Sequence, residues 1–196
     1  MIKVGLTGGI GTGKSYISNI FTHLYIPIYN SDTRAKKLML ENIKIKNELI
    51  KLLGAKTYIN GQLNKKWIAS QIFTNPSLKK QIEQIIHPEV KKDFEQWLNT
   101  HHTHKIIVKE TALLIESGTY KDMDKVILVT APSGIRIKRI MQRDNITQEE
   151  AIKRIKAQLP DNEKLKFADF VIENDEKKLL LPQVIKILQN ICPDVL

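Results

Sequence analysis

Short apolar runs alternate along this chain with stretches in which apolar residues recur every three or four positions. The runs predict buried strands, at residues 2–6, 25–30, 105–110, 126–130 and 169–172. The stretches between them predict helices, as where apolar side chains recur at Ile17, Ile20, Phe21 and Leu24. Alternating strands and helices predict an α/β fold with a parallel sheet of about five strands and right-handed crossovers.

One long stretch between the second and third predicted strands reads as helix only. Residues 42–98 carry successive apolar stripes and no clear strand, with Gly54 closing the first helix and Asn60-Gly61 forming a turn. His87-Pro88 is expected to interrupt the last of these helices. We expect a helical lobe at about 42–98, inserted into the sheet domain as a place for substrate.

A second helical pair follows the fourth predicted strand, and it is basic. Arg136, Arg139 and Arg143 are three and four positions apart, so they share one helix face. Asp144-Asn145 ends that helix, and Thr147 to Glu150 has the form of a capping box that starts the next. The pair predicts either a lid that closes over phosphates, at about 134–164, or a solvated basic face. The core is then 1–41, 99–133 and 165–196 of one domain spanning 1–196, which ends in a helix predicted over 177–190.

Composition narrows the class of protein. A chain of 196 residues with 42% hydrophobic residues suits one domain with a full core. The only cysteine is Cys192, which excludes a disulfide framework and favours a reducing compartment, so we expect a cytoplasmic protein. We expect no cleaved leader, and no apolar run approaches the ~18 residues that span a membrane.

The formal net charge of +10 has two interpretations. Nucleic-acid binding is one, and a lysine-rich surface around an anion site is the other. The lysines are spread along the whole chain and aromatic residues make up only 6%, which favours the second interpretation. The three histidines within 99–104 could suggest a metal site, but no cysteine or carboxylate lies in that run, so we expect a solvated connection.

The chemistry concentrates in one glycine-rich loop between the first strand and the first helix. Its sequence fits G-x-x-x-x-G-K-[ST] in full, with Gly8, Gly9, Ile10, Gly11, Thr12, Gly13, Lys14 and Ser15. Such a loop brings backbone N–H groups around a phosphate, and the helix after it adds its positive dipole end. Lys14 can reach the terminal phosphates and the Ser15 hydroxyl can ligate Mg²⁺. The loop predicts a P-loop NTPase-type sheet that binds a nucleoside triphosphate.

Two other residues have roles that spacing alone leaves open. Asp32 follows the second strand, at the sheet edge where ligands collect, yet a plain helix cap at Ser31-Asp32 would also explain it. His87 is ambiguous too, and its place just before a proline favours a structural hydrogen-bonding role over a functional one.

The ordered set of motifs resembles the dephospho-CoA kinase family over nearly the whole chain. Its loop is similar to residues 5–15, its Asp-Ala-Asp segment to Asn30-Ser31-Asp32 with Arg34 beyond, and its His-Pro element to residues 87–88. The later matches are Leu113-Leu114-Ile115-Glu116, Met141-Gln142-Arg143-Asp144, Arg154, Ala157-Gln158, Ala168-Asp169 and Ile172-Glu173-Asn174. There are departures, at Asn30 for the first Asp, Ala112 for a proline, Lys164 for an arginine and Glu176 for a glycine.

The resemblance implies an ATP- and Mg²⁺-dependent kinase that phosphorylates the ribose 3′-hydroxyl of dephospho-CoA. It implies catalytic roles for Asp32 as base and for Lys14, Arg139 and Arg143 as charge stabilisers, with Ser15 on Mg²⁺. The nucleotide would contact the loop from Gly8 to Ser15 together with Tyr16, Arg143 and Asn174. The substrate would contact Asp32, Arg34, His87 and Glu116.

Two other functions remain compatible with the residues. A kinase for a nucleotide or another small metabolite would show the same loop and lid, and a substrate panel separates it from the first. A nucleotide-dependent nucleic-acid-binding regulator is suggested by the loop and the charge, although no Asn-Lys-x-Asp guanine-reading segment is present. We expect a small-molecule substrate, with no nucleic-acid or membrane partner.

Overall fold

The computed structural model describes residues 1–195, which form two compact units. The first unit joins residues 1–30 to the chain from His101 onward, and the second is Ser31–Thr100. The sequence predicts a helical lobe at about 42–98. The second unit is longer than that lobe, because it also includes the helix that follows the second strand. No helix among residues 1–195 is long and apolar enough to cross a membrane.

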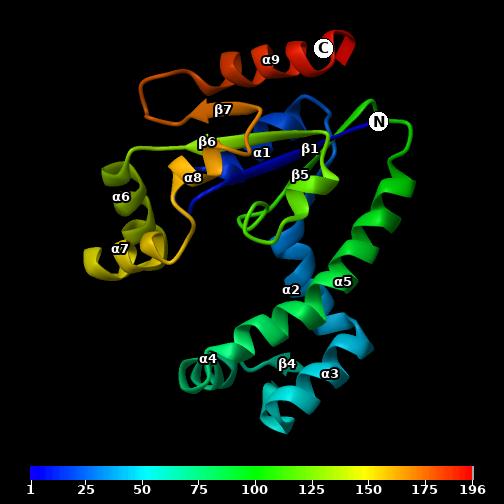
Figure 1. Ribbon diagram of the computed structural model, residues 1–196, viewed down its shortest axis with the longest axis vertical. Coiled ribbons are helices and arrows are strands. Elements are labelled where there is room, and N and C mark those ends of the chain that lie inside the picture. The colour runs from blue at the N-terminus through cyan, green and yellow to red at the C-terminus, as the bar shows by residue number, and fades with distance from the viewer. Residues whose placement is uncertain (196) are drawn as a thin grey trace. The chain divides into compact units, whose positions relative to one another are not determined.

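A parallel five-stranded sheet organises the first unit (Figure 1), as the apolar runs predict. Its order is β2-β5-β1-β6-β7, so β1 lies in the centre between β5 and β6. The strands are β1 (Ile2–Gly8), β2 (Ile28–Asn30), β5 (Ile106–Glu110), β6 (Lys125–Thr130) and β7 (Phe170–Glu173). The strands that follow β1 in the chain, β2 and β5, lie on one side of it, and β6 and β7 lie on the other. β1 therefore ends at the switch point of the strand order, which is where ligands bind in such sheets.

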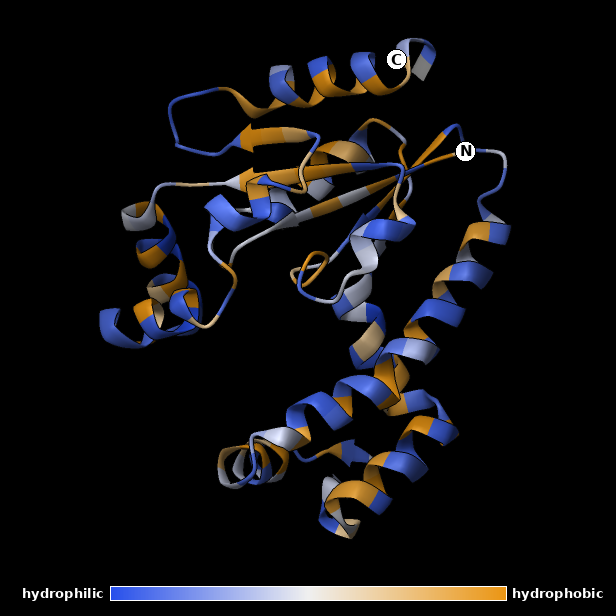
Figure 2. Cartoon of the chain, in the orientation of Figure 1, coloured by the Kyte–Doolittle hydropathy of each residue, from blue (hydrophilic) through white to orange (hydrophobic). Residues whose placement is uncertain are grey.

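The core of the first unit lies between one face of this sheet and two helices, α1 (Lys14–His23) and α9 (Leu180–Ile191). Alternate residues of β1, such as Val4 and Leu6, point into it and are buried. Phe21 of α1 and Leu188 of α9 close it from outside the sheet. The hydrophobic colour in Figure 2 gathers on the strands and on the side of α9 that faces them. This packing fixes both the end of β1 and the start of α1, and therefore the loop between them.

The lid segment, predicted at about 134–164 as a helical pair, spans three helices of the first unit. These are α6 (Ser133–Asp144), α7 (Gln148–Lys156) and α8 (Asp161–Leu165). Asn145 ends α6 in the left-handed conformation, and Thr147 and Glu150 form the predicted capping box of α7. Figure 1 shows β6 leading directly into α6, with α7 beside it.

Two elements of the first unit are shorter in the structure than the sequence predicts. The strand predicted at 25–30 pairs only over Ile28–Asn30, because Tyr25 has a left-handed backbone and Pro27 has no N–H to donate. The helix predicted from 177 begins at Leu180, because Asp175 Oδ1 accepts from the N–H groups of Lys177 and Lys178 and holds them in a turn. Short 3-10 helices cover Thr119–Asp122 and Pro193–Val195.

The second unit is mainly helical but contains a small hairpin that the sequence analysis did not predict. Its helices are α2 (Ser31–Glu41), α3 (Ile43–Leu53), α4 (Lys65–Thr74) and α5 (Ser77–Thr100), with a 3-10 turn at Ala55–Thr57. The hairpin pairs β3 (Tyr58–Ile59) with β4 (Gln62–Leu63). Asn60 and Gly61 both have positive φ and make the two-residue turn. The prediction of no strand in 42–98 was wrong because strands of two residues leave no periodicity to read.

The expected interruption at His87-Pro88 was also wrong. α5 is one continuous helix of 24 residues with Pro88 in its interior. Proline removes one hydrogen bond and crowds the preceding turn, which normally ends or kinks a helix. Here Ile86, Val90 and Phe94 are buried on one face of α5, and that burial on both sides of the proline holds the helix together.

Candidate active site

The glycine-rich loop follows β1 directly and runs into the first turn of α1. Gly13 has φ +92, and a Cβ there would collide with the side-chain amide of Asn174. Thr12 is buried, and its hydroxyl donates to Gly9 O at 2.8 Å, which closes the loop on itself. A side chain at residue 13 would open this arrangement, so the glycine spacing of the motif is a packing requirement here.

Lys14 points back over the start of the loop. Its Nζ donates to Gly8 O at 2.8 Å and to Gly9 O at 3.4 Å. A P-loop lysine reaches the terminal phosphates of a bound nucleotide. The terminal-phosphate end of this loop is therefore at residues 8–10, and the opposite end is the N-terminus of α1 with Ser15 and the exposed Tyr16.

Arg139 and Asn174 brace the outer, carbonyl side of the loop. Asn174, which is buried, donates from Nδ2 to Thr12 O at 2.8 Å. Arg139 donates to Gly11 O at 3.3 Å and to Asn174 Oδ1 at 3.1 Å. A guanidinium thus lies against the loop, where its charge can also act on phosphates.

Glu176 holds the same arginine from the loop after β7. Its Oε1 lies 3.0 Å from Arg139 Nη2. Glu176 has φ +63, a left-handed backbone that costs a residue with a side chain about 1 kcal/mol. The chain therefore carries a carboxylate at a position where the resemblance leads us to expect glycine, and that carboxylate contacts a lid arginine.

Arg143, one turn beyond Arg139, is engaged elsewhere in the lid segment. Its Nε and Nη2 donate to the two oxygens of Asp144 at 2.7 and 2.9 Å, and Arg154 Nη1 donates to the same carboxylate at 2.5 Å. The hydrogen bonds from Arg143 hold the pKa of Asp144 below its ordinary value, and Asp144 raises the pKa of Arg143. Two arginines therefore share one carboxylate and keep a net positive charge.

Glu110 is a candidate site residue that the sequence analysis did not single out. It ends β5 beside β1, in register with Leu6, and is 5% exposed. Its Oε2 accepts from Ser18 Oγ at 2.7 Å and from Asn30 Nδ2 at 2.8 Å. The signal was an acidic residue at the carboxyl end of a strand that begins with three apolar residues, and the sequence analysis counted it only as part of that strand.

Glu110 and Ser15 fit the needs of Mg²⁺. Mg²⁺ prefers oxygen ligands, keeps several waters and is held by one or two protein groups together with substrate phosphates. A P-loop serine with an acidic residue at the end of a neighbouring strand is the usual pair in P-loop enzymes. Within residues 1–195 no three His, Cys, Asp or Glu side chains gather as a metal site, the histidines of 99–104 included.

Asp32 and Arg34 belong to the second unit. Asp32 is in the first turn of α2 rather than before it, because the helix begins at Ser31. Only Ser31 separates it from Asn30, so the chain keeps the two Cα atoms within about 7 Å of each other. Arg34 forms a two-pronged ion pair with Asp93 of α5, with Nε 2.8 Å from Oδ2. The arginine thus ties α2 to α5 within the unit.

The second unit also contains an apolar pocket of about 320 Å³ between its helices. Leu49, Ile68 and Ile86 are among its lining side chains, and Lys65 is the only charged one. His87 follows Ile86 but is exposed on the outside of α5. Both features lie in the part of the chain where a substrate lobe is expected.

Glu116 forms an ion pair with a buried lysine of the first unit. Lys164 of α8 has no exposed surface, and its Nζ lies 2.7 Å from Glu116 Oε1. The contact is charge to charge, because Nζ has no well-directed hydrogen-bond acceptor among residues 1–195. The pair joins the loop after β5 to the end of the lid segment.

Replacing Glu116 with glutamine is expected to lower the free energy of unfolding by about 3 kcal/mol. The ammonium of Lys164, which has no exposed surface, would then lose its charge partner, and an unpaired buried charge costs more than the pair itself contributes. Urea unfolding measures the loss, and the double variant Lys164→Met, Glu116→Gln should recover much of it. Unchanged stability in the single variant would show that the ion pair is not formed in solution.

A central parallel strand that runs through a phosphate-binding loop into a helix, with a lysine over the loop and arginines from a lid segment, defines a P-loop kinase. The fold is also that of a shikimate kinase from Acinetobacter baumannii, at a TM-score of 0.56 and 15% identity over 99% of this chain and 94% of that one. The chain belongs to the dephospho-CoA kinase family, whose pattern it matches over residues 2–179. Its activity is that family's, an ATP-dependent phosphotransfer.

Individual relatives agree with this assignment. The dephospho-CoA kinase of Bacteroides fragilis is 40% identical over 95% of this chain and 91% of its own, and that of Porphyromonas gingivalis is 40% identical over 97% and 95%. The solved dephospho-CoA kinase from Campylobacter jejuni is 30% identical, with a TM-score of 0.72 over 99% of this chain and 98% of that chain. The Thermus thermophilus structure TT1252 has a TM-score of 0.87 at 29% identity, over 97% of both chains.

Proposed function

We propose that this chain transfers the γ-phosphoryl group of ATP to the 3′-hydroxyl of the ribose of dephospho-CoA, giving coenzyme A and ADP. The observation that carries the proposal is the braced phosphate loop with Lys14 at its terminal-phosphate end, in a chain that matches the family over residues 2–179. Phosphoryl transfer needs mainly positioning and electrostatic stabilisation, and the loop supplies both.

In this proposal the loop backbone and Lys14 hold the β- and γ-phosphates. Arg139 adds positive charge close to the loop, and Arg143 brings a second charge from the lid segment when Asp144 releases it to the nucleotide. Asn174 and its neighbours border the adenine, and Tyr16 contacts the nucleotide from the first turn of α1. The support for these roles is the set of contacts that join Arg139 and Asn174 to the loop carbonyls.

Ser15 and Glu110 would hold Mg²⁺ through oxygen, Glu110 with Ser18 and Asn30 fixing its carboxylate. When bound, the metal ion would neutralise charge that develops on the β- and γ-oxygens. Asn30 is neutral and donates to Glu110, whereas an aspartate at position 30 would place a second negative charge against that carboxylate.

Asp32 is proposed as the general base that accepts the proton of the 3′-hydroxyl. The support is its position just after the carboxyl end of β2, on the edge of the sheet where the loop also lies. The second unit, with Arg34 and His87, would receive the pantetheine-bearing substrate, and its apolar pocket offers space for the less polar parts of that arm. Glu116 acts in this proposal through Lys164, at the border of the lid segment.

Changing Arg139 to alanine is expected to lower kcat by about 10²-fold, and changing Arg143 to alanine by at least about tenfold, with smaller effects on stability. Each change removes a charged donor that would act on the transferring group. Steady-state kinetics with both substrates varied gives kcat, and thermal unfolding gives stability. Full activity in both variants would show that Arg139 and Arg143 belong to a solvated basic face of α6 and do not act on the transferring group.

The direct test of the substrate is an ADP-release assay with Mg-ATP and a panel of acceptors. We expect ADP only with dephospho-CoA, and none with nucleosides, nucleotides or small hydroxy acids at the same concentration. Comparable turnover with another acceptor would favour a different metabolite kinase. Parallel reactions without acceptor measure ATP hydrolysis and provide the background.

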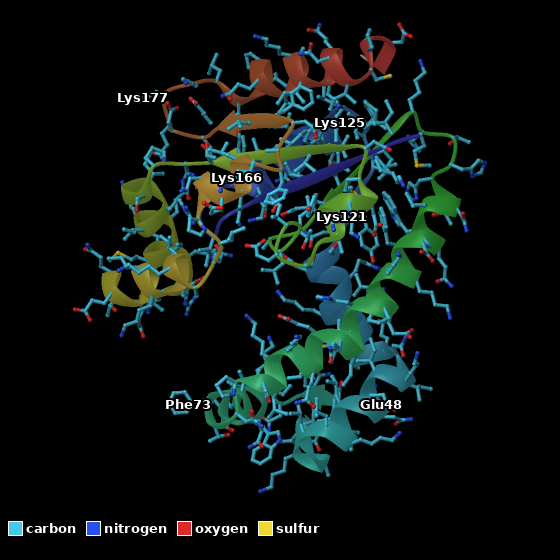
Figure 3. All side chains as sticks on the ribbon, viewed as in Figure 1. Glu48, Phe73, Lys121, Lys125, Lys166 and Lys177 are labelled. Carbon is cyan, nitrogen blue, oxygen red and sulfur yellow. The ribbon has the colours of Figure 1, made fainter. Side chains whose placement is uncertain are left out.

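We also propose a cytoplasmic protein without a nucleic-acid partner. The lone Cys192 suits a reducing compartment. The lysines labelled in Figure 3 project from separate elements of the first unit, and Lys125 and Lys166 pair with Asp169 and Glu163. A duplex-binding titration at two salt concentrations should give no salt-sensitive complex at low micromolar protein.

A further inference from the structure

The lid segment binds both the backbone N–H and the backbone C=O of one loop residue, Ile10. Ile10 N–H donates to Gln158 Oε1 at 2.7 Å, and Ile10 O accepts from Arg136 Nε at 2.9 Å. Gln158 follows α7 and Arg136 lies in the first half of α6, so the two ends of the lid segment meet at this residue. We call Arg136, Gln158 and the Ile10 peptide groups the Ile10 clamp.

The clamp is built into the packing rather than lying on the surface. Arg136 is 7% exposed, and its Nη1 is fixed by Asp161 at 3.1 Å. A Cβ at Gly9 would collide with the Arg136 guanidinium, so the arginine can approach Ile10 only because residue 9 is a glycine. Loop and lid segment are therefore shaped for each other at this point.

The clamp lies at the terminal-phosphate end of the loop. Lys14, which reaches toward the β- and γ-phosphates, places its ammonium on Gly8 O and Gly9 O, directly before Ile10 in the chain. The other end of the loop is at the start of α1, which serves the remaining phosphates. A shift of the Ile10 N–H and C=O groups should consequently change the binding of a γ-phosphate more than the binding of an α- or β-phosphate.

We propose that Gln158 and Arg136 are positioning residues that fix the Ile10 peptide groups and thereby set the preference of the site for ATP over ADP. This rests on the proposed binding of the ATP phosphates by the loop. With the clamp closed, the γ-phosphate end of the loop is already in its binding geometry and little ordering remains to be done on binding. With the clamp broken, ATP loses that advantage and ADP does not.

The test is equilibrium binding to Gln158→Met in the presence of Mg²⁺. Methionine keeps the length of the side chain but offers no amide oxygen to Ile10 N–H. The Kd of the β,γ-methylene analogue of ATP should rise about tenfold, the scale of one hydrogen bond, while the Kd of ADP changes less than twofold. Equal changes for both nucleotides, or no change for either, would overturn the proposal. The readout needs no acceptor substrate, so failure here is separate from failure of the proposed reaction.

A matched control and a second variant make the test specific. Gln148→Met makes the same chemical change at an exposed lid position and should alter neither Kd; a tenfold rise there would count against the clamp. Arg136→Met removes the other half, and in Gln158→Met, Arg136→Met the rise for the ATP analogue should be well below the product of the two single rises, because both act on the Ile10 peptide groups. Multiplicative effects would show that the two residues act separately.

The contact itself can be observed without nucleotide. In the ¹H–¹⁵N spectrum of the unliganded protein, the Ile10 amide proton should move upfield in Gln158→Met, because a hydrogen bond of 2.7 Å is lost. An Ile10 resonance that stays in place would mean that Gln158 does not hold this N–H in solution, which also overturns the proposal. This measurement remains decisive if Arg136→Met proves too unstable to study, since Gln158 is half-buried and carries no charge.

Discussion

Lys14→Ala is expected to reduce kcat by about 10²- to 10³-fold or more. The change removes a preorganised positive charge from the terminal-phosphate end of the loop, where negative charge is transferred. The lysine side chain belongs to no apolar cluster and donates to loop carbonyls, so the sheet and its core should remain folded. Steady-state turnover measures the first effect, and thermal unfolding measures the second.

Lys138→Ala is the matched control for this variant, because it removes the same charge from an exposed position on α6. Its turnover should equal that of the wild-type protein. A folded Lys14→Ala protein with wild-type turnover would show that the loop does not carry the chemistry.

Asp32→Asn is expected to lower kcat by about 10²- to 10⁴-fold, the usual contribution of a positioned general base. The amide keeps the size of the side chain but cannot take a proton at neutral pH. ATP binding should survive, because Asp32 is outside the loop. As Asp32 is in the first turn of α2, neutralising it also removes a favourable helix-dipole interaction, worth less than about 1 kcal/mol.

The competing view of Asp32 is that it only stabilises the start of α2. On that view Asp32→Asn keeps near-normal turnover, and stability falls only in Asp32→Ala. Glu41→Gln neutralises a carboxylate at the other, exposed end of the same helix and controls for the loss of charge. Full turnover in Asp32→Asn, with binding of ATP intact, would remove the base assignment.

Much of the fold follows from sequence because its signals are local. Five apolar runs and a strand–loop–helix motif predicted the parallel sheet, and the Thr147 capping box predicted where α7 begins. The errors lie where local rules compete with packing. Pro88 should interrupt α5, but burial of Ile86 and Val90 on either side of it keeps the helix continuous. The β3–β4 hairpin has only two residues per strand, too few to show alternation.

The site was predictable in part for the same reason. The loop is contiguous in sequence, so its residues could be assigned in one step. Glu110, by contrast, gains its surroundings from Ser18 and Asn30, which are 92 and 80 positions away. The sequence marked Lys164 only as a lysine where the family resemblance leads us to expect arginine, and nothing local predicted its burial beside Glu116. Such pairings depend on the register of the sheet and the path of the lid segment, and no local pattern records them.

The most direct measurement of the central claim is the position of the transferred phosphate. Dephospho-CoA is incubated with the wild-type protein and Mg-ATP carrying an isotopically labelled γ-phosphate, and the product is analysed by ³¹P NMR and mass spectrometry. The account predicts one new labelled phosphomonoester coupled to the ribose 3′ proton, formed together with an equal amount of ADP and almost absent with Lys14→Ala. A label on another hydroxyl, or ADP formed with labelled inorganic phosphate alone, would contradict it.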